Sequence, residues 1–303
     1  MKIGICAGAK QIAQLKKGMA DYAELNLSQV YEMTNGEIKE TANVLAACGV
    51  PAEAANCFFS AEVKLCGRLF DKNRVREYCK KALYNGAQLG IHTCVLGSGK
   101  SRCIDEGEQK EDCIKQLEEA ICIAGDAANE FGTTIVLEPL NKKETNVLNT
   151  VAEGAALCRK LHHPNVMLLA DIYHVALENE SLDEISKNGD ILRHVHIARP
   201  EGRLYPMEHD GFDYPTVKNA LDKASYDLRI SIEGASPGDF VKSAEESLQF
   251  LKSGFHTDRA PAAAGPGIHS SPPQPALRES AAPRPAPVDW QGPRNPRQSY
   301  RSR

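Results

Sequence analysis

The stretch that decides the fold runs Thr133-Thr134-Ile135-Val136-Leu137-Glu138-Pro139-Leu140-Asn141. Its first five residues are β-branched or aliphatic, a composition typical of a buried strand. Pro139 has no backbone N–H and cannot continue a hydrogen-bonded ladder. The stretch therefore predicts a buried strand that ends on the carboxylate of Glu138.

Three later strand-like runs end in the same way, on a side chain that can bind a metal ion. They lead to Asp171, His196 and Glu233. Successive members of the set Glu138, Asp171, His196 and Glu233 are 33, 25 and 37 residues apart. Each interval has room for a strand, a helix and two short loops, which is the spacing of repeated βα units.

Eight strand-like runs alternate with helical patterns through most of the chain. The predicted strands are residues 3–6, 22–25, 54–59, 93–96, 133–137, 166–170, 192–196 and 228–232. The predicted helices, with apolar residues three and four apart, are residues 37–48, 72–88, 110–131, 149–161, 181–187, 214–223 and 242–252. Eight repeats in about 250 residues predict an α/β protein with a single (β/α)₈ TIM barrel. An open doubly wound sheet is the rival, but residues 6–10 lack its glycine-rich phosphate turn.

The composition favours small-molecule chemistry. The 303 residues are 42% hydrophobic and 25% charged, and the net charge of −4 argues against a nucleic-acid partner. No apolar segment approaches the roughly 20 residues that span a bilayer, and no signal peptide is evident, so we expect a cytoplasmic protein without a membrane partner. The ten cysteines are expected to be free and buried as small hydrophobic residues, with Cys66 or Cys103 as a possible thiol nucleophile.

The composition changes near Gly254. Residues 255–303 hold 10 of the 17 prolines and seven arginines against three acidic residues. Such a segment buries too little apolar surface to offset its ordering entropy. We therefore predict a barrel domain at residues 1–254 and a disordered tail, rich in proline, alanine and arginine, at residues 255–303.

The four strand-end side chains are expected to meet, because the carboxyl ends of the strands form the active-site face of a TIM barrel. Three carboxylates and one imidazole suit a hard or borderline divalent ion, Mn²⁺, Co²⁺ or Mg²⁺, with Zn²⁺ as an alternative. The simpler interpretation is four unrelated polar caps. Glu138, Asp171, His196 and Glu233 at matching ends of successive units favour the metal site.

These motifs resemble the xylose-isomerase-like sugar phosphate isomerase/epimerase superfamily, in particular the D-tagatose and D-psicose (D-allulose) 3-epimerases. The resemblance rests on residues 137–141 with Glu144, residues 170–174, residues 194–196 with Arg203, and residues 231–234. It implies that Glu138, Asp171, His196 and Glu233 bind the metal ion. It also implies that Glu144, His174 and Arg203 bind substrate. The family's arginine commonly follows the ligand histidine by six residues, whereas here Gly202 takes that place and Arg203 follows by seven.

The resemblance implies a ketose 3-epimerase, acting on a ketose or sugar phosphate and forming a homodimer or homotetramer. Glu138 and Glu233 are expected to remove and return the proton at carbon 3 through a metal-bound enediolate. Ser98, in a predicted flexible loop over residues 97–101, is a further candidate for substrate contact. His194 is either a support for the site or a buried histidine of the barrel interior.

Other reactions remain open at this stage. Aldose–ketose isomerisation of a sugar, sugar phosphate or hydroxypyruvate, and dehydration of an inosose, use the same enediolate chemistry. An endonuclease IV-like phosphodiesterase is less favoured, because residues 58–60 and 97–98 lack the histidines that its metal cluster needs. A non-catalytic sugar-binding barrel would be expected to have lost one of the four ligands.

Overall fold

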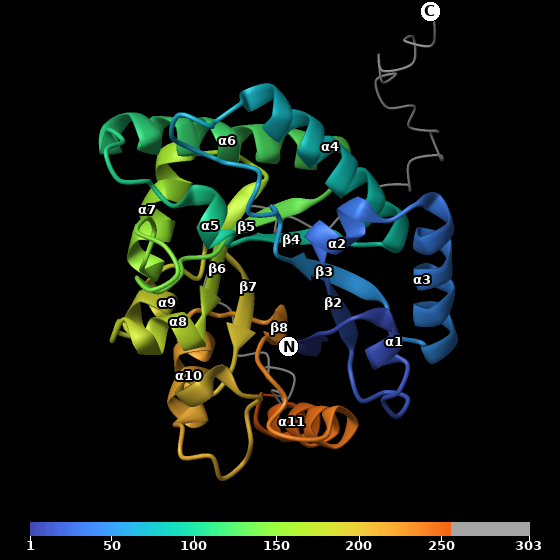
Figure 1. Cartoon of the computed structure of the whole chain (residues 1–303). Helices are drawn as coiled ribbons and strands as arrows, with labels where there is room; N and C mark the ends of the chain where they lie inside the picture. Colours follow the sequence, from blue (N-terminus) through green and yellow to red (C-terminus); the bar gives the residue numbers. More distant parts are fainter. Residues whose placement is uncertain (256–303) are drawn as a thin grey trace, which may run out of the picture. The chain divides into compact units, whose positions relative to one another are not determined.

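Eight parallel strands close into a barrel in the order β1 to β8 (Figure 1). The computed structural model describes residues 1–255. The strands are β1 Lys2–Cys6, β2 Tyr22–Asn26, β3 Ala52–Asn56, β4 Thr93–Leu96, β5 Thr134–Leu137, β6 Val166–Asp171, β7 Leu192–Ile197 and β8 Arg229–Ile232. β8 pairs with β1 through Lys2 to Ile5, which closes the sheet. The predicted TIM barrel is confirmed.

Helices surround the strands, as Figure 1 shows for α3, α4, α6, α7, α10 and α11. The helices are α1 Ala9–Ile12, α2 Leu27–Glu32, α3 Asn35–Cys48, α4 Lys72–Leu89, α5 Gly99–Arg102, α6 Lys110–Glu130, α7 Val151–Leu161, α8 Ile172–Leu177, α9 Asp183–Lys187, α10 Tyr214–Lys223, α11 Phe240–Phe255 and the 3₁₀ turn η1 Glu201–Arg203. Local sequence fixes their ends: Thr34 and Glu37 form a capping box at the start of α3, and Gly49 ends that helix with a φ of 72°.

Side chains inside the barrel alternate along each strand, because successive residues of a strand point to opposite faces. Val95, Val136 and Leu169 form a small apolar cluster contributed by β4, β5 and β6. Two residues further along β5 and β6 come Glu138 and Asp171, on the same inward face. The apolar layer therefore closes the barrel below a polar layer at the carboxyl ends of the strands.

The structure corrects several predicted boundaries. The strand predicted at residues 54–59 ends at Asn56, because Cys57 has a left-handed backbone with a φ of 51°. The loop predicted at residues 97–101 contains the start of α5. The last helix continues past Lys252 to Phe255, whose side chain is buried. The predicted disordered tail otherwise lies outside the described residues and stays a prediction.

All ten cysteines are free, as predicted, but only five of them are buried and Cys57 is exposed, so the expected burial was wrong for half of them. Burial raises the pKa of Cys66 to about 12, which argues against this thiol as a nucleophile. Among residues 1–255, no helix is long and apolar enough to cross a membrane.

Candidate metal centre

The ends of β5 to β8 bring the four predicted ligands together. Glu138 and Glu233 directly follow β5 and β8, while Asp171 is the last residue of β6 and His196 the last but one of β7. One ligand atom from each of Glu138, Asp171, His196 and Glu233 lies within 4.8 Å of the other three. We call these four residues the ligand quartet. Their spacing in the sequence predicted one ligand in each of four successive βα units. The barrel brings these four strand ends side by side.

The two ring nitrogens of His196 face different partners. Nδ1 lies 3.0 Å from Glu138 Oε1 and 3.1 Å from Glu233 Oε2. Nε2 lies 2.9 Å from Oε1 of Glu24, a residue of β2. An ionised carboxylate only accepts hydrogen bonds, so Glu24 keeps the proton on Nε2. By the same argument Glu138 and Glu233 accept from Nδ1, and although burial opposes the charged form, Glu233 and Glu24 raise the pKa of His196. A divalent ion at the quartet would displace the proton on Nδ1, while Nε2 would keep its hydrogen bond to Glu24.

Glu24 is the principal residue of the site that the sequence prediction missed. Its carboxylate is fully buried, and Oε2 also accepts from His194 Nε2 at 2.8 Å and from the Ser231 hydroxyl. Tyr22 contacts the same hydroxyl at 2.6 Å. An acidic residue inside the predicted strand at residues 22–25 was the available signal. His194 is thus a buried histidine of the barrel interior that also contacts the Glu24 carboxylate behind the site.

Burial and crowding of like charges shape the electrostatics of the quartet. Burial, and then the neighbouring Glu233, raise the pKa of Glu138. Burial raises the pKa of Asp171 to about 7. Burial acts in the same direction on Glu233, but His196 and Arg203 hold the pKa of that carboxyl below its usual range. Three carboxylates at one point, Glu138 and Asp171 buried and Glu233 partly exposed, favour a bound cation.

The donor set fits a divalent ion. It has three carboxylates and an imidazole whose second nitrogen is held by Glu24, and a carboxylate–histidine–metal arrangement of this kind is common in metal sites. Oxygen-rich sets with one nitrogen suit Mn²⁺, Co²⁺ or Mg²⁺. The identity of the ion stays a prediction.

Arg203 reaches the quartet from the turn after β7. Its Nη2 lies 3.2 Å from Asp171 Oδ2 and also contacts Glu233, while Nη1 lies 3.6 Å from Glu144 Oε1. Left-handed backbones at Gly202 and Arg203, with φ of 75° and 48°, turn the chain back toward the barrel mouth. This turn brings the Arg203 guanidinium to the quartet although Arg203 follows His196 by seven residues.

His174 lies in α8, the helix that the Asp171 side chain caps by accepting from the Tyr173 amide. Its Nδ1 lies 2.8 Å from the Asn141 side-chain nitrogen and 3.2 Å from the Asn141 backbone nitrogen. Both are donors, so Nδ1 accepts and Nε2 carries the proton. Nε2 is buried and makes no hydrogen bond among the described residues, although Asp171 Oδ2 is 3.4 Å away. Asn141 also donates to Glu144 at 3.0 Å, so the predicted substrate contacts form one cluster.

Two residues after β4, Gly97 and Arg102, contact Glu138 and fix its position. A Cβ on Gly97 would lie 2.1 Å from Glu138 Oε2, so any larger residue would force the carboxylate to move. Arg102 is fully buried and donates to the backbone oxygen of Glu138 at 2.9 Å. Ser98, the further candidate for substrate contact, uses its hydroxyl within the protein. The hydroxyl accepts from the Phe59 amide at 3.0 Å, in the loop after β3.

The fold and this strand-end ligand set define the class of protein. A model of the xylose isomerase-like TIM barrel family matches residues 12–254, and the chain belongs to that family.

Several curated relatives are sugar epimerases or isomerases. The chain is 32% identical to a D-psicose 3-epimerase of Agrobacterium fabrum over 133 residues, covering 43% of this chain and 46% of that protein. A ketose 3-epimerase of Arthrobacter globiformis is 31% identical, over 39% of this chain and 40% of that protein. These matches thus span less than half of either relative. An L-ribulose 3-epimerase of Methylomonas sp. matches at 26% identity over 76% of this chain and 79% of that protein.

Solved structures agree on the fold. A D-psicose 3-epimerase crystallised with D-fructose superposes with a TM-score of 0.74 at 22% identity, covering 84% of this chain and 99% of that one. An E. coli 3-keto-D-glucoside 4-epimerase superposes with a TM-score of 0.72 at 21% identity, covering the same shares of the two chains. At these identities the likeness establishes the barrel alone.

Proposed function

We propose that this protein is a divalent-metal-dependent sugar epimerase or isomerase, and specifically a ketose 3-epimerase. One observation carries the proposal: Glu138 and Glu233 lie at the two ends of the ligand quartet and both approach His196 Nδ1, at 3.0 Å and 3.1 Å. Inverting a carbon next to a ketone needs a base on one face and an acid on the other. Two carboxylates that reach one binding point from different strands, β5 and β8, could supply that pair.

In the proposed reaction, one of the two glutamates removes the proton from carbon 3. The electron pair of the C–H bond moves to the carbonyl oxygen and leaves an enediolate. The other glutamate, protonated beforehand, gives its proton to the opposite face of carbon 3. The two carboxyl groups have then exchanged protonation states, and the reverse reaction or solvent restores them.

The other residues of the site would orient the sugar. His174 has its Nε2–H free among the described residues and can donate to a substrate oxygen. Arg203 lies next to Glu144, so the two side chains can bind hydroxyl groups of the sugar and hold carbon 3 between the glutamates. Glu138, Asp171, His196 and Glu233 would hold the divalent ion, which supplies a Lewis acid for the carbonyl group.

The names of the relatives support an epimerase or isomerase, and three of them are 3-epimerases. A putative hydroxypyruvate isomerase of Xenopus laevis is 28% identical over 51% of this chain and 56% of that protein. Aldose–ketose isomerisation is therefore the second candidate, because it uses the same proton transfer between adjacent carbons.

The test is turnover of fructose, psicose, tagatose, sorbose, ribulose and xylulose in D₂O. Protein stripped with EDTA is compared with protein reloaded with Mn²⁺, Co²⁺ or Mg²⁺. We expect metal-dependent deuterium incorporation at carbon 3, and none above background in Glu138→Gln or Glu233→Gln. Retained turnover in either variant contradicts the two-carboxylate mechanism. Reaction of hydroxypyruvate, with no ketose reacting, would select the isomerase instead.

The expected homodimer or homotetramer is a prediction that sedimentation velocity tests, and the cytoplasmic location is one that cell fractionation tests.

A further inference from the structure

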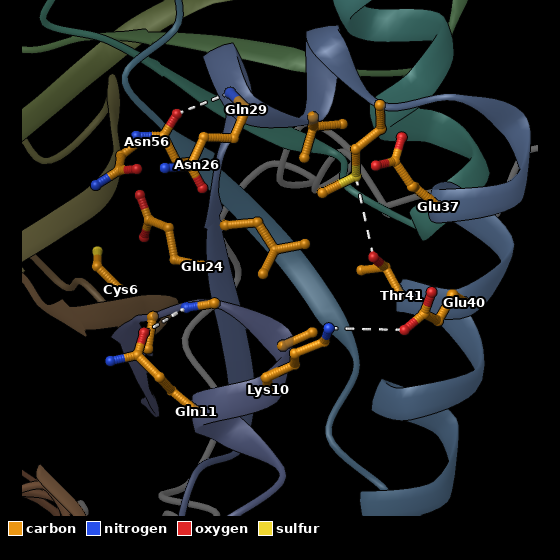
Figure 2. A pocket seen from close by; sticks show the side chains of 16 residues that line it. Cys6, Lys10, Gln11, Glu24, Asn26, Gln29, Glu37, Glu40, Thr41 and Asn56 are labelled. Carbon is orange, nitrogen blue, oxygen red and sulfur yellow. Dashed lines mark hydrogen bonds and ion pairs between the residues drawn. The ribbon is translucent and has the colours of Figure 1, made fainter.

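A cavity of about 560 Å³ opens beside the ligand quartet (Figure 2). In this close-up Cys6, Glu24 and Asn56 lie on one side of the hollow. Glu40 and Thr41, on α3, lie on the opposite side. The cavity therefore runs outward from the strand ends, over the first turns of α1 and α2, to α3. We call it the α3 groove.

The inner end of the α3 groove adjoins the proposed reaction centre. Asn56 donates to Glu233 Oε1 at 2.7 Å, and the Cys6 thiol lies within 4.8 Å of ligand atoms of Glu24 and His196. A sugar held at the quartet would therefore lie next to the opening of the groove, with one end close to it. A substituent on that end would enter it.

The groove is larger than a simple ketose needs. A ketohexose has only twelve non-hydrogen atoms, whereas pockets of roughly 300–1,000 Å³ enclose ligands of drug size. The groove is also lined by β1 to β3 and α1 to α3, on one side of the quartet, so its volume is additional to the space between the glutamates. A second unit of about the size of a sugar ring fits this space.

The charges of the lining disfavour a phosphate group. Lys10 is the one cationic residue among those that line the groove, and its Nζ lies 3.8 Å from Glu40. Glu24 and Glu37 add two more carboxylates to the wall. A dianionic phosphate would meet net negative charge here, and like charges repel.

The polar but uncharged part of the lining suits hydroxyl groups. Asn26, Gln29 and Asn56 offer amide groups, which donate and accept hydrogen bonds. Val30 and Met33 offer apolar surface between them. A sugar ring has hydroxyls on its rim and C–H groups on its faces, so both kinds of surface are matched.

We propose that the α3 groove binds an uncharged sugar unit joined to the ketose, so that the substrate is a neutral ketose-containing disaccharide or similar glycoside rather than a phosphorylated ketose. This inference rests on the proposed function, because the ketose unit is placed at the quartet.

Three probes that differ only at carbon 6 of fructose test the proposal. They are fructose, fructose 6-phosphate and isomaltulose, which carries a glucose unit on the same oxygen. The measurement is kcat/KM for deuterium incorporation at carbon 3 by the metal-loaded full chain. We expect the kcat/KM for isomaltulose to exceed that for fructose about tenfold or more. The kcat/KM for fructose 6-phosphate should fall below that for fructose.

Two variants fill the groove with a bulky side chain: Thr41→Trp and Gln29→Trp, the latter at an exposed position. Each should lower the kcat/KM for isomaltulose to that for fructose and leave the kcat/KM for fructose unchanged. The matched control is Asn43→Trp, an exposed position of α3 outside the lining, which should change nothing. Preference for fructose 6-phosphate, or an isomaltulose rate no higher than that of fructose, overturns the proposal.

Calorimetric titration with isomaltulose separates this proposal from the proposed function. If no probe exchanges deuterium but isomaltulose binds the wild type and not Thr41→Trp, the 3-epimerase function fails and the groove assignment stands. If fructose exchanges deuterium and isomaltulose neither reacts faster nor binds more tightly than fructose, the function stands and the groove assignment fails. If isomaltulose neither binds nor reacts, the groove assignment fails whatever the fate of the function.

Discussion

Replacing Glu24 by glutamine should weaken metal binding without any change in the ligand quartet. The Glu24 carboxylate accepts from His196 Nε2 at 2.9 Å and from His194 Nε2 at 2.8 Å, one on each oxygen. Glutamine has one acceptor oxygen and one NH₂ group, so it can accept from only one of the two histidines. The other histidine must lose its hydrogen bond or move its proton to Nδ1.

Both arrangements carry a cost. If the amide oxygen faces His194, the proton of His196 moves to Nδ1 and the lone pair that faces the quartet is lost. If the oxygen faces His196, the proton of His194 moves to its Nδ1, a buried atom with no hydrogen-bond partner among the described residues. A hydrogen bond to a charged group contributes about 1.5–3 kcal/mol, equivalent to roughly 10- to 150-fold in a binding constant. Removing a carboxylate behind a metal-binding histidine commonly lowers metal affinity by about 10- to 100-fold.

Calorimetry with Mn²⁺ on EDTA-stripped protein measures this effect directly. We expect the Kd of Glu24→Gln to rise about 10- to 100-fold, and the Tm of the stripped protein to fall by a few degrees. The matched control is Glu53→Gln, at the opposite end of the barrel, where the carboxylate accepts from Arg229 Nε at 2.7 Å and contacts Lys2. It should lower the Tm and leave the Kd unchanged. A Glu24→Gln variant that binds Mn²⁺ within about twofold of wild type would refute the reasoning.

Three further predictions concern metal binding, Gly97 and Cys66. Restoring Mn²⁺ at about 100 times its Kd to stripped protein should stabilise the fold by about 2.7 kcal/mol, a Tm rise of roughly 5–11 °C in a thermal melt, and an unchanged Tm would contradict a metal site here. Gly97→Ala should reduce turnover about tenfold or more because its Cβ would lie 2.1 Å from Glu138 Oε2, whereas Gly36→Ala, whose nearest neighbour is 3.9 Å away, should match wild type. Iodoacetamide at pH 8 should leave Cys66 unmodified in the folded protein and alkylate it after denaturation, since burial raises its pKa to about 12; mass spectrometry of the native protein showing full alkylation would be the contrary result.

Local sequence was sufficient for the elements that depend on local periodicity. The helix predicted at residues 214–223 is α10 at Tyr214–Lys223, and the strand predicted at residues 93–96 is β4. Where the pattern continued across a backbone irregularity, the prediction overran. The strand predicted to reach Phe59 stops at Asn56 because the left-handed Cys57 ends it.

The sequence by itself determined the barrel and the four candidate ligands. Each of these residues closes a strand-like run, and the spacing of the runs assigns one ligand to each of four consecutive βα units. In a parallel barrel all strand ends of one kind lie on one face, so convergence follows from topology without coordinates.

Only the tertiary structure decided what surrounds those ligands. Glu24 lies 172 residues from His196 in the chain, and Asn56 lies 177 residues from Glu233. These contacts exist because β8 pairs with β1 and closes the sheet, which brings the first three strands to the other side of the same mouth. No local pattern encodes the register of that closure, nor the 560 Å³ cavity that α1 to α3 leave beside it.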